Sequence, residues 1–185
     1  MSAAPLPHNE VARLKALKLL QVLDTAPEDA FDQITSTAAQ IFGVPIALIS
    51  LVDANRQWFK SCYGLSTSQT GRDESFCAHA ILDSRPFIIP DALQDPRFCD
   101  NILVTNPPYI RFYAGVTLIT PEGYGLGTLC LLDTQPRSFS EADSVRLTRL
   151  AGGVMSRLML RLANLSLEKI NLEMAQVRPV REYHL

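Results

Sequence analysis

The sequence predicts an α+β domain in which helices from both ends of the chain cover one face of a central antiparallel β-sheet. Three observations lead to this prediction. Apolar residues with helical spacing occupy both ends of the chain, short apolar and β-branched segments occupy its middle, and tight turns join those segments in pairs. Strands that are joined by tight turns pair in the antiparallel sense.

Two helices are expected at the start of the chain. Residues 10–23 repeat apolar side chains at helical spacing, and Asn9 precedes them as a candidate N-cap. Thr25 and Glu28 have the spacing of a capping box, so we expect a second helix to begin there. Gly43 is expected to end that helix, since glycine adopts the left-handed conformation that follows many helices.

Five strands are expected in the middle of the chain. Residues 46–52 are continuously apolar, which is typical of a strand covered on both faces. A short turn leads to a second strand, in which Trp58 and Phe59 must point to opposite faces. A brief strand between prolines follows later. Residues 111–120 and 126–133 form the clearest hairpin in the sequence.

A short helix and two long connections lie between those strands. Ser75 is placed to cap the helix "SFCAHAILDS". The segments 64–83 and 91–110 lie on the side of the sheet that the terminal helices leave free. Long irregular segments in a compact domain usually cover a site. We therefore expect a cavity between these two segments and the sheet.

The final helix is expected to begin at Ser140 and Asp143, to reach about Val177 and to end before Pro179. It carries two apolar stripes. The earlier stripe is expected to face the sheet, whereas the later one has heptad spacing and no partner within the chain. Because monomers rarely leave such a stripe in water, we predict a homodimer through the terminal helices. The earlier stripe is Leu147, Leu150, Val154 and Leu158, and the later one is Leu160, Ala163, Leu167, Ile170, Met174 and Val177.

Composition and charge exclude several classes of partner. The chain has 17 basic and 19 acidic residues, which gives no electrostatic case for nucleic acid or an anionic membrane. No apolar run approaches the roughly 20 residues of a membrane helix, and the N-terminus lacks the pattern of a signal peptide. We therefore expect a cytoplasmic protein.

The sequence does not identify a cofactor. It predicts no metal site and no disulfide framework, because no CxxC pair occurs among Cys62, Cys77, Cys99 and Cys130.

Six segments together resemble the GAF domain family over residues 9–165: "LDTAPEDAFDQIT", "PIALISLVDANRQWFKS", "ESFCAHAI", "DALQDPRF", "PPYIRFYAGVTLIT" and "GTLCLLD". The resemblance implies a GAF/PAS-like antiparallel sheet of five or six strands, with the terminal helices on one face and a ligand cavity on the other. It also implies a non-catalytic bacterial sensor of small molecules that relays binding through those helices. Such domains often precede histidine kinase or cyclic-dinucleotide output domains. Residues 1–8 would be a flexible N-terminus, and residues 166–185 a helix extension and tail.

The signatures of specialised GAF relatives do not match this chain. Cyclic-nucleotide-binding members carry an NKxxF…DE signature, whereas this chain has "NRQWFK" in a turn. Bilin-binding members attach their chromophore through a cysteine followed directly by histidine, whereas Ala78 separates Cys77 from His79 here. The alternative function is a cysteine-based redox sensor or a thiol reductase similar to the free methionine-(R)-sulfoxide reductases. That chemistry needs a second cysteine within reach of the first.

Seven residues are candidates for ligand contact. Cys77 and His79 would point about 200° apart on a helix, so we do not expect them to share an ion or a proton. Cys77 is either a small buried thiol or, in the first turn of its helix, a thiol with a lowered pKa. An arginine of the long loop either holds a ligand carboxylate or phosphate, or braces the loop through an aspartate. The seven candidates are Phe76, Cys77, His79, Asp91, Arg97, Arg111 and Tyr113.

Overall fold

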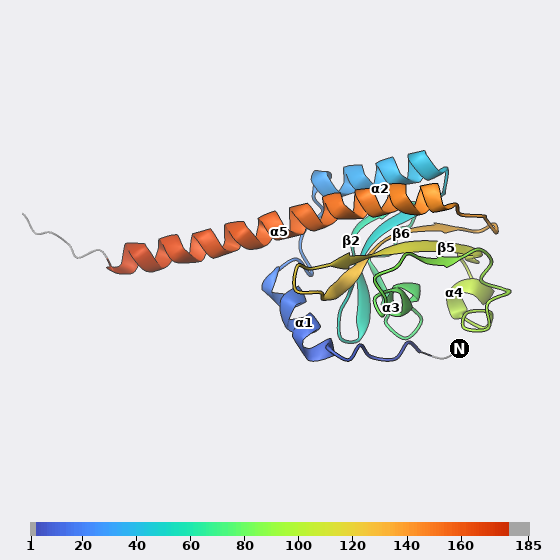
Figure 1. The fold of residues 1–185 in the computed structure, drawn as a ribbon, viewed down its shortest axis with the longest axis horizontal. Helices are drawn as coiled ribbons and strands as arrows, with labels where there is room; N and C mark the ends of the chain where they lie inside the picture. Colours follow the sequence, from blue (N-terminus) through green and yellow to red (C-terminus); the bar gives the residue numbers. More distant parts are fainter. Residues whose placement is uncertain (1–2, 178–185) are drawn as a thin grey trace, which may run out of the picture.

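The computed structural model describes residues 3–177, and its six strands form one antiparallel sheet in the order β3-β2-β1-β6-β5-β4 (Figure 1). This confirms the α+β fold class and the antiparallel sheet. The strands are β1 (Ile46–Val52), β2 (Arg56–Tyr63), β3 (Gln69–Gly71), β4 (Phe87–Ile89), β5 (Phe112–Ile119) and β6 (Gly125–Asp133). The helices are α1 (Glu10–Leu19), α2 (Asp29–Phe42), α3 (Phe76–Ala80), α4 (Ile102–Thr105) and α5 (Glu141–Val177).

The middle of the sheet separates two apolar cores. All seven residues of β1 are buried, because β1 pairs with β2 on one side and with β6 on the other, and both of its faces are covered. Successive side chains of β2 divide between the cores, as predicted: Trp58 packs on the side of α2 and α5, and Phe59 packs on the side of α3. The sheet therefore carries a helical layer on one face and the long connections on the other.

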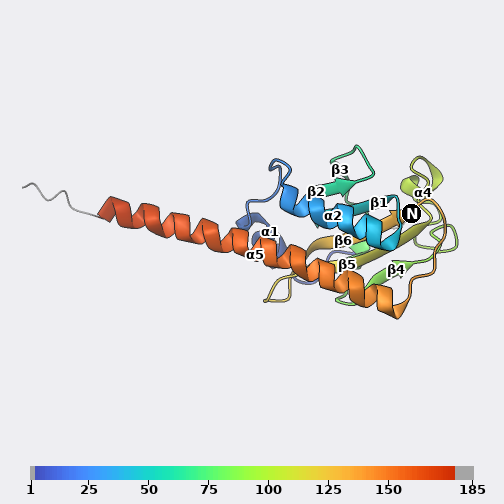
Figure 2. The same ribbon diagram turned by 90° about the horizontal axis from the view of Figure 1, so that it is seen from above.

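The helical layer consists of α2 and α5, which lie side by side across the sheet (Figure 2). Gly43 ends α2 with a left-handed φ of 59°, as predicted. Ser140 and Asp143 open α5 with a reciprocal cap, in which each side chain accepts the backbone N–H of the other residue at 3.1 Å. The earlier stripe of α5 faces the sheet, with Leu147, Val154 and Leu158 fully buried and Leu150 packed at the edge of this core.

The start of α2 differs from the prediction. α2 begins at Asp29 with Glu28 as the residue before it, and neither Thr25 nor Glu28 forms a capping box. The buried Lys60 of β2 explains the difference, because its ammonium group binds the Thr25 hydroxyl at 2.8 Å and the Glu28 carboxylate at 2.6 Å. A partner that is distant in the sequence thus recruits both side chains. Asn9 precedes α1, but its side chain makes no capping hydrogen bond.

The first helix, α1, lies at the end of the sheet beside the turn between β5 and β6 (Figure 1) and ends at Leu19, before the expected residue 23. Arg13 on this helix is fully buried. Its guanidinium donates to the carbonyl oxygen of Val52 at 2.7 Å and to the Glu10 carboxylate at 2.7 and 2.8 Å. Arg72 binds the same carboxylate at 2.5 Å. This Arg13–Glu10–Arg72 network joins α1 to the segment that leads into α3.

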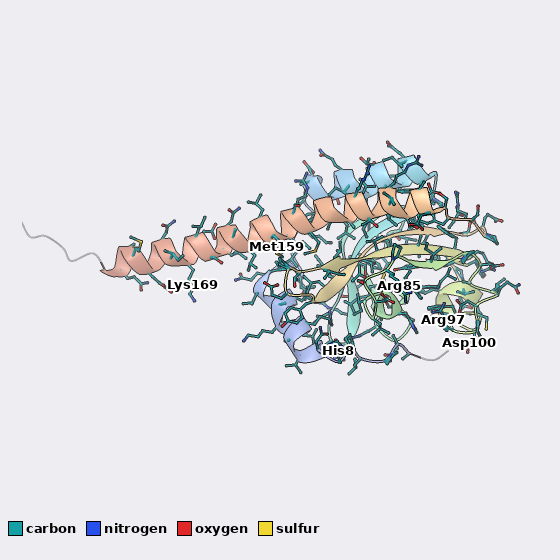
Figure 3. The ribbon with its side chains drawn as sticks, viewed as in Figure 1. His8, Arg85, Arg97, Asp100, Met159 and Lys169 are labelled. Atoms are coloured by element: carbon teal, nitrogen blue, oxygen red, sulfur yellow. The ribbon has the colours of Figure 1, made fainter. Side chains whose placement is uncertain are left out.

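The second half of α5 projects away from the sheet, as Met159 and Lys169 mark in Figure 3. Arg161 ties the base of this projection to the segment between α1 and α2, with bonds of 2.8 Å to the Leu20 carbonyl and 2.7 Å to the Gln21 carbonyl. Next to that tie and beyond it, the described side chains of the later stripe are exposed: Leu160, Ala163, Leu167, Ile170 and Met174.

Two sequence predictions fall partly outside the described residues. Residues 1–2 belong to the expected N-terminal segment, and residues 178–185 to the expected tail, which includes Pro179. Within residues 3–177, no helix combines the length and apolar character that a membrane span requires.

Candidate functional site

A small cavity lies between the sheet and the two long connections, where it was predicted, with a volume of about 80 Å³. Strands β1, β2, β5 and β6 form its floor, and α3, α4 and the connections form its walls and roof. The lining residues are Leu48, Gln57, Phe59, Leu65, Thr67, Thr70, Phe76, Cys77, Leu103, Pro108, Ile110, Tyr113, Cys130 and Leu132.

No aspartate, glutamate, lysine, arginine or histidine side chain lines this cavity. Its few polar side chains are an amide, three hydroxyl groups and two thiols, and the other residues are apolar. A charged ligand would lose its hydration in such a space without gaining a countercharge, which is unfavourable by several kcal/mol in general. The cavity is therefore suited to a small uncharged molecule.

Two hydroxyl side chains fix α3 above the sheet. Ser75 accepts the backbone N–H of Ala78 at 3.0 Å, which confirms its predicted role as N-cap, and its own hydroxyl donates to Gln57 of β2. At the other end, the hydroxyl group of Thr117 lies 3.0 Å from the carbonyl oxygens of Ala80 and Asp83. Because both ends of this short helix are held, Cys77 in its first turn faces the sheet.

Cys77 lies at the centre of a buried cluster of thiols and hydroxyls. Its sulfur is 3.8 Å from the sulfur of Cys130, 3.1 Å from the hydroxyl of Thr128 and 3.3 Å from the hydroxyl of Tyr113. We call these four residues the thiol cluster; it joins α3 to β5 and β6. Two sulfur atoms and two hydroxyl donors thus meet at one wall of the cavity.

The surroundings of Cys77 favour its thiolate form. Burial raises the pKa of Cys77, but hydrogen bonds from Cys130, Thr128 and Tyr113 outweigh that effect and lower the pKa to about 7. Burial and the neighbouring Cys77 raise the pKa values of Cys130 and Tyr113 well above their ordinary range. Cys77 is therefore the first of these groups to lose its proton.

The seven predicted site residues separate into two groups. Phe76, Cys77 and Tyr113 line the cavity, and the ring of Phe76 stacks on Tyr113 with centroids 5.3 Å apart. His79 is outside the lining, and its ring packs edge-to-face with that of Phe98, with centroids 4.9 Å apart. Phe98 in turn stacks on Phe76 at 4.3 Å, so this aromatic layer separates His79 from the cavity.

The charged candidates brace the long loop. Arg97 forms a two-point ion pair with Asp95 at 2.5 and 2.9 Å and covers nearby aromatic rings, and Figure 3 places it beside α4. Asp91 accepts the backbone N–H of Leu93 at 3.1 Å in a turn. Arg111 donates to the carbonyl oxygen of Val104 at 2.9 Å, at the end of α4. None of these three charged side chains lines the cavity, and their roles in ligand binding stay predictions.

Sequence reasoning missed Thr128 as a member of the site and left the position of Cys130 open. Thr128 and Cys130 are two residues apart on one strand, which signals that they share a face. Nothing local indicates that α3 lies above that face. Among residues 3–177, no group of three histidine, cysteine or acidic side chains is arranged to hold a metal ion. The absence of a metal in the protein stays a prediction.

Comparison with known proteins places this arrangement in a family. The model of the GAF domain matches residues 26–158. A cyclic di-GMP phosphodiesterase of Pseudomonas aeruginosa is 43% identical over 159 residues, which cover 85% of this chain and 27% of that protein. The chain thus spans about a quarter of the length of this curated relative.

Solved structures show the same fold at low sequence identity. The blue-light absorbing form of the Thermosynechococcus elongatus PixJ GAF domain has a TM-score of 0.61 and 13% identity, with 90% of this chain and 98% of that chain covered. A free methionine-R-sulfoxide reductase from Neisseria meningitidis, in complex with its substrate, has a TM-score of 0.58 and 17% identity, with 86% and 96% covered. Because the family model matches most of the sheet and its helices, the chain belongs to the GAF domain family.

Proposed function

We propose that this domain senses a small uncharged molecule in the cavity and relays its binding through the terminal helices, without catalysing a reaction on it. The uncharged cavity beneath α3 carries this proposal. Its volume of about 80 Å³ is smaller than the roughly 150 Å³ of an apolar cavity that holds benzene. The ligand class is therefore a molecule of a few heavy atoms.

The same lining argues against the alternative, a reductase of free methionine sulfoxide. Such a substrate is an amino acid with an ammonium and a carboxylate group, and no charged side chain lines the cavity to receive either one. A cyclic dinucleotide with two phosphates meets the same objection. If the domain serves a cyclic-dinucleotide enzyme, it senses a signal other than the nucleotide.

A chain of contacts supports a relay from the cavity to α1. Ser75 caps α3 at the cavity wall, and its backbone N–H donates to the carbonyl oxygen of Arg72 at 3.1 Å. The Arg72 side chain binds Glu10 on α1. A ligand that displaces α3 therefore acts on a segment that is bonded to the first terminal helix.

The exposed stripe of α5 supports a homodimer as the second part of the relay. Leu160, Leu167, Ile170 and Met174 are each at least half exposed, and a second copy of α5 would cover them as a coiled coil. Sedimentation at micromolar concentration should give the mass of a dimer. Leu167→Glu combined with Ile170→Glu should shift it to the monomer. Leu172→Glu, which changes an exposed leucine outside the stripe, is the control, and a monomeric parent would refute the proposal.

The output of this relay is proposed from the relatives. The Pseudomonas aeruginosa protein pairs a matching segment with a cyclic di-GMP phosphodiesterase activity in a longer chain. A GAF-like structure also comes from a two-component sensor histidine kinase of Sinorhizobium meliloti. We propose that this domain controls a cytoplasmic output of one of these two kinds.

Xenon is a suitable probe for the cavity, because it is small, uncharged and apolar. Xenon pressure should shift the NMR signals of the residues that line the cavity. Leu103→Trp should abolish these shifts by filling the space, whereas Ile102→Trp, on the neighbouring exposed position of α4, should preserve them. Unchanged signals at Cys77 and Tyr113 in the parent protein would contradict the proposed binding site. Mass spectrometry of the purified protein would then search for the natural ligand.

A further inference from the structure

We propose that Cys77 and Cys130 form a reversible intramolecular disulfide when hydrogen peroxide, or another small uncharged hydroperoxide, enters the cavity. The inference rests on the proposed function in one respect: the oxidant enters the same cavity that is proposed to bind the ligand. It assigns the two sulfur atoms a chemical role, and it makes the sensor responsive to oxidation.

The geometry of the two sulfur atoms carries the proposal. They lie 3.8 Å apart, whereas a disulfide requires about 2.05 Å, so closure needs a relative movement of about 1.8 Å. Rotation about the side-chain bonds of both cysteines supplies movement of this size. Cys77 belongs to a helix of only five residues, and Cys130 lies in the centre of the sheet, which makes α3 the element that adjusts.

The cavity selects the oxidant. Both cysteines are at most 1% exposed, and both line the cavity, so a reagent reaches them through that space. Hydrogen peroxide has two heavy atoms and no charge, which suits a cavity of about 80 Å³ whose lining has no acidic or basic side chain. A bulky or charged disulfide such as oxidised glutathione does not meet these limits. Cys99, in contrast, is exposed and reports on any oxidant in solution.

The reaction proceeds in two balanced steps. The Cys77 thiolate attacks one peroxide oxygen, the O–O bond breaks, and Cys77 becomes a sulfenic acid while the leaving hydroxide takes up the proton that Cys77 released. Cys130 then attacks the Cys77 sulfur, the S–O bond breaks, and the second hydroxide leaves as water with the proton of Cys130. Two thiols and one hydrogen peroxide thus give one disulfide and two waters.

The hydroxyl groups of the thiol cluster assist the first step. Thr128 and Tyr113 direct hydrogen bonds at Cys77, which stabilise its thiolate, and Cys130 retains its proton until the second step. The titratable groups that contact Cys77 in the cluster are Cys130 on β6 and Tyr113 on β5. Oxidation should therefore be faster at pH 8 than at pH 6, because more of Cys77 is then thiolate.

The test uses the chain with Cys62→Ser and Cys99→Ser, so that only the two cluster cysteines remain. Hydrogen peroxide should abolish both free thiols and lower the mass by two hydrogen atoms, and a phosphine reductant should restore them. Cys130→Ala should stop the reaction at a sulfenic acid on Cys77, which dimedone traps. Peptide mass spectrometry on the unaltered chain provides the same disulfide assignment without relying on these variants.

Two matched pairs of variants test the mechanism. Thr128→Val should slow disulfide formation about fivefold at pH 7, the effect of raising a thiol pKa by roughly one unit, whereas Thr148→Val on α5 should not change the rate. Leu103→Trp should slow it by closing the cavity, and Ile102→Trp should not. Two outcomes would overturn the proposal. In the first, hydrogen peroxide oxidises Cys99 of the unaltered, folded chain but leaves both cluster thiols free. In the second, Cys77 becomes a sulfinic acid and no disulfide forms. Xenon binding without a disulfide refutes this inference alone, and a disulfide without xenon binding refutes the sensor alone.

Discussion

Replacing Glu10 with glutamine removes the negative charge that lies between the buried guanidinium groups of Arg13 and Arg72. Burial raises the pKa of Glu10, but hydrogen bonds and charges from both arginines outweigh it and lower the pKa from 4.5 to about 2. A carboxyl group with a lowered folded-state pKa stabilises the fold above its unfolded pKa. That contribution is lost as the pH falls toward 2.

The size of the effect follows from these two pKa values. A fall from 4.5 to about 2 corresponds to at most about 3 kcal/mol of unfolding free energy at pH 7. The Glu10 side chain retains 13% exposure, and screening by water lowers our expectation to about 2 kcal/mol. At pH 3 this group is almost fully protonated in the unfolded chain and still mostly charged in the folded one, so the difference should shrink to about 1 kcal/mol.

Urea unfolding of the parent and Glu10→Gln at pH 7 and pH 3 measures both values. Glu173→Gln serves as the control, because its ion pair with Lys169 is long, at 3.9 Å, and exposed, so we expect a change below about 0.5 kcal/mol. Equal unfolding midpoints for the parent and Glu10→Gln at pH 7, or a difference that does not vary with pH, would refute the reasoning about this network.

Three further predictions concern the elements around the cavity. Ser75→Ala should lower the free energy of unfolding by about 1 kcal/mol through loss of the N-cap, and an unchanged urea midpoint would contradict this role. Gly127→Ala should cost about 3 kcal/mol, because its Cβ would lie 1.9 Å from the carbonyl oxygen of Ser50; calorimetry that shows no loss would exclude the clash. Phe76→Ala should cost about 3 to 5 kcal/mol in urea unfolding through loss of its two ring contacts, whereas a loss below 1 kcal/mol would be inconsistent with them.

Features with a local cause were predictable from the sequence. The apolar run of β1, the glycine that ends α2 and the cap at Ser75 each depend on a few neighbouring residues, and each forms as expected. Short elements without a pattern were missed. β3 has only three residues and exists because it pairs with Arg56, Gln57 and Trp58 of β2, and α4 is a single turn within the long loop.

Features with a distant cause were not predictable. No neighbouring residue indicates that Arg13 of α1 is buried, because its partners Val52 and Gly125 are 39 and 112 residues away. Thr25 and Glu28 have the spacing of a cap, but Lys60 binds both. The same limit applies to the site. The sequence shows Cys77 and Cys130, but only the packing of α3 on β6 brings their sulfur atoms together.

The projection of α5 gives the domain a mechanical property. Residues 160–177 span about 27 Å at 1.5 Å per residue, and Arg161 holds the base of this arm against the segment between α1 and α2. In the proposed relay, Arg161 would be the point about which the arm turns. A tilt of about 4° there moves the far end by about 2 Å, which is comparable to the shift that closes the two sulfur atoms. In the proposed relay, a small rotation at the base of the arm would therefore give a larger displacement at its tip.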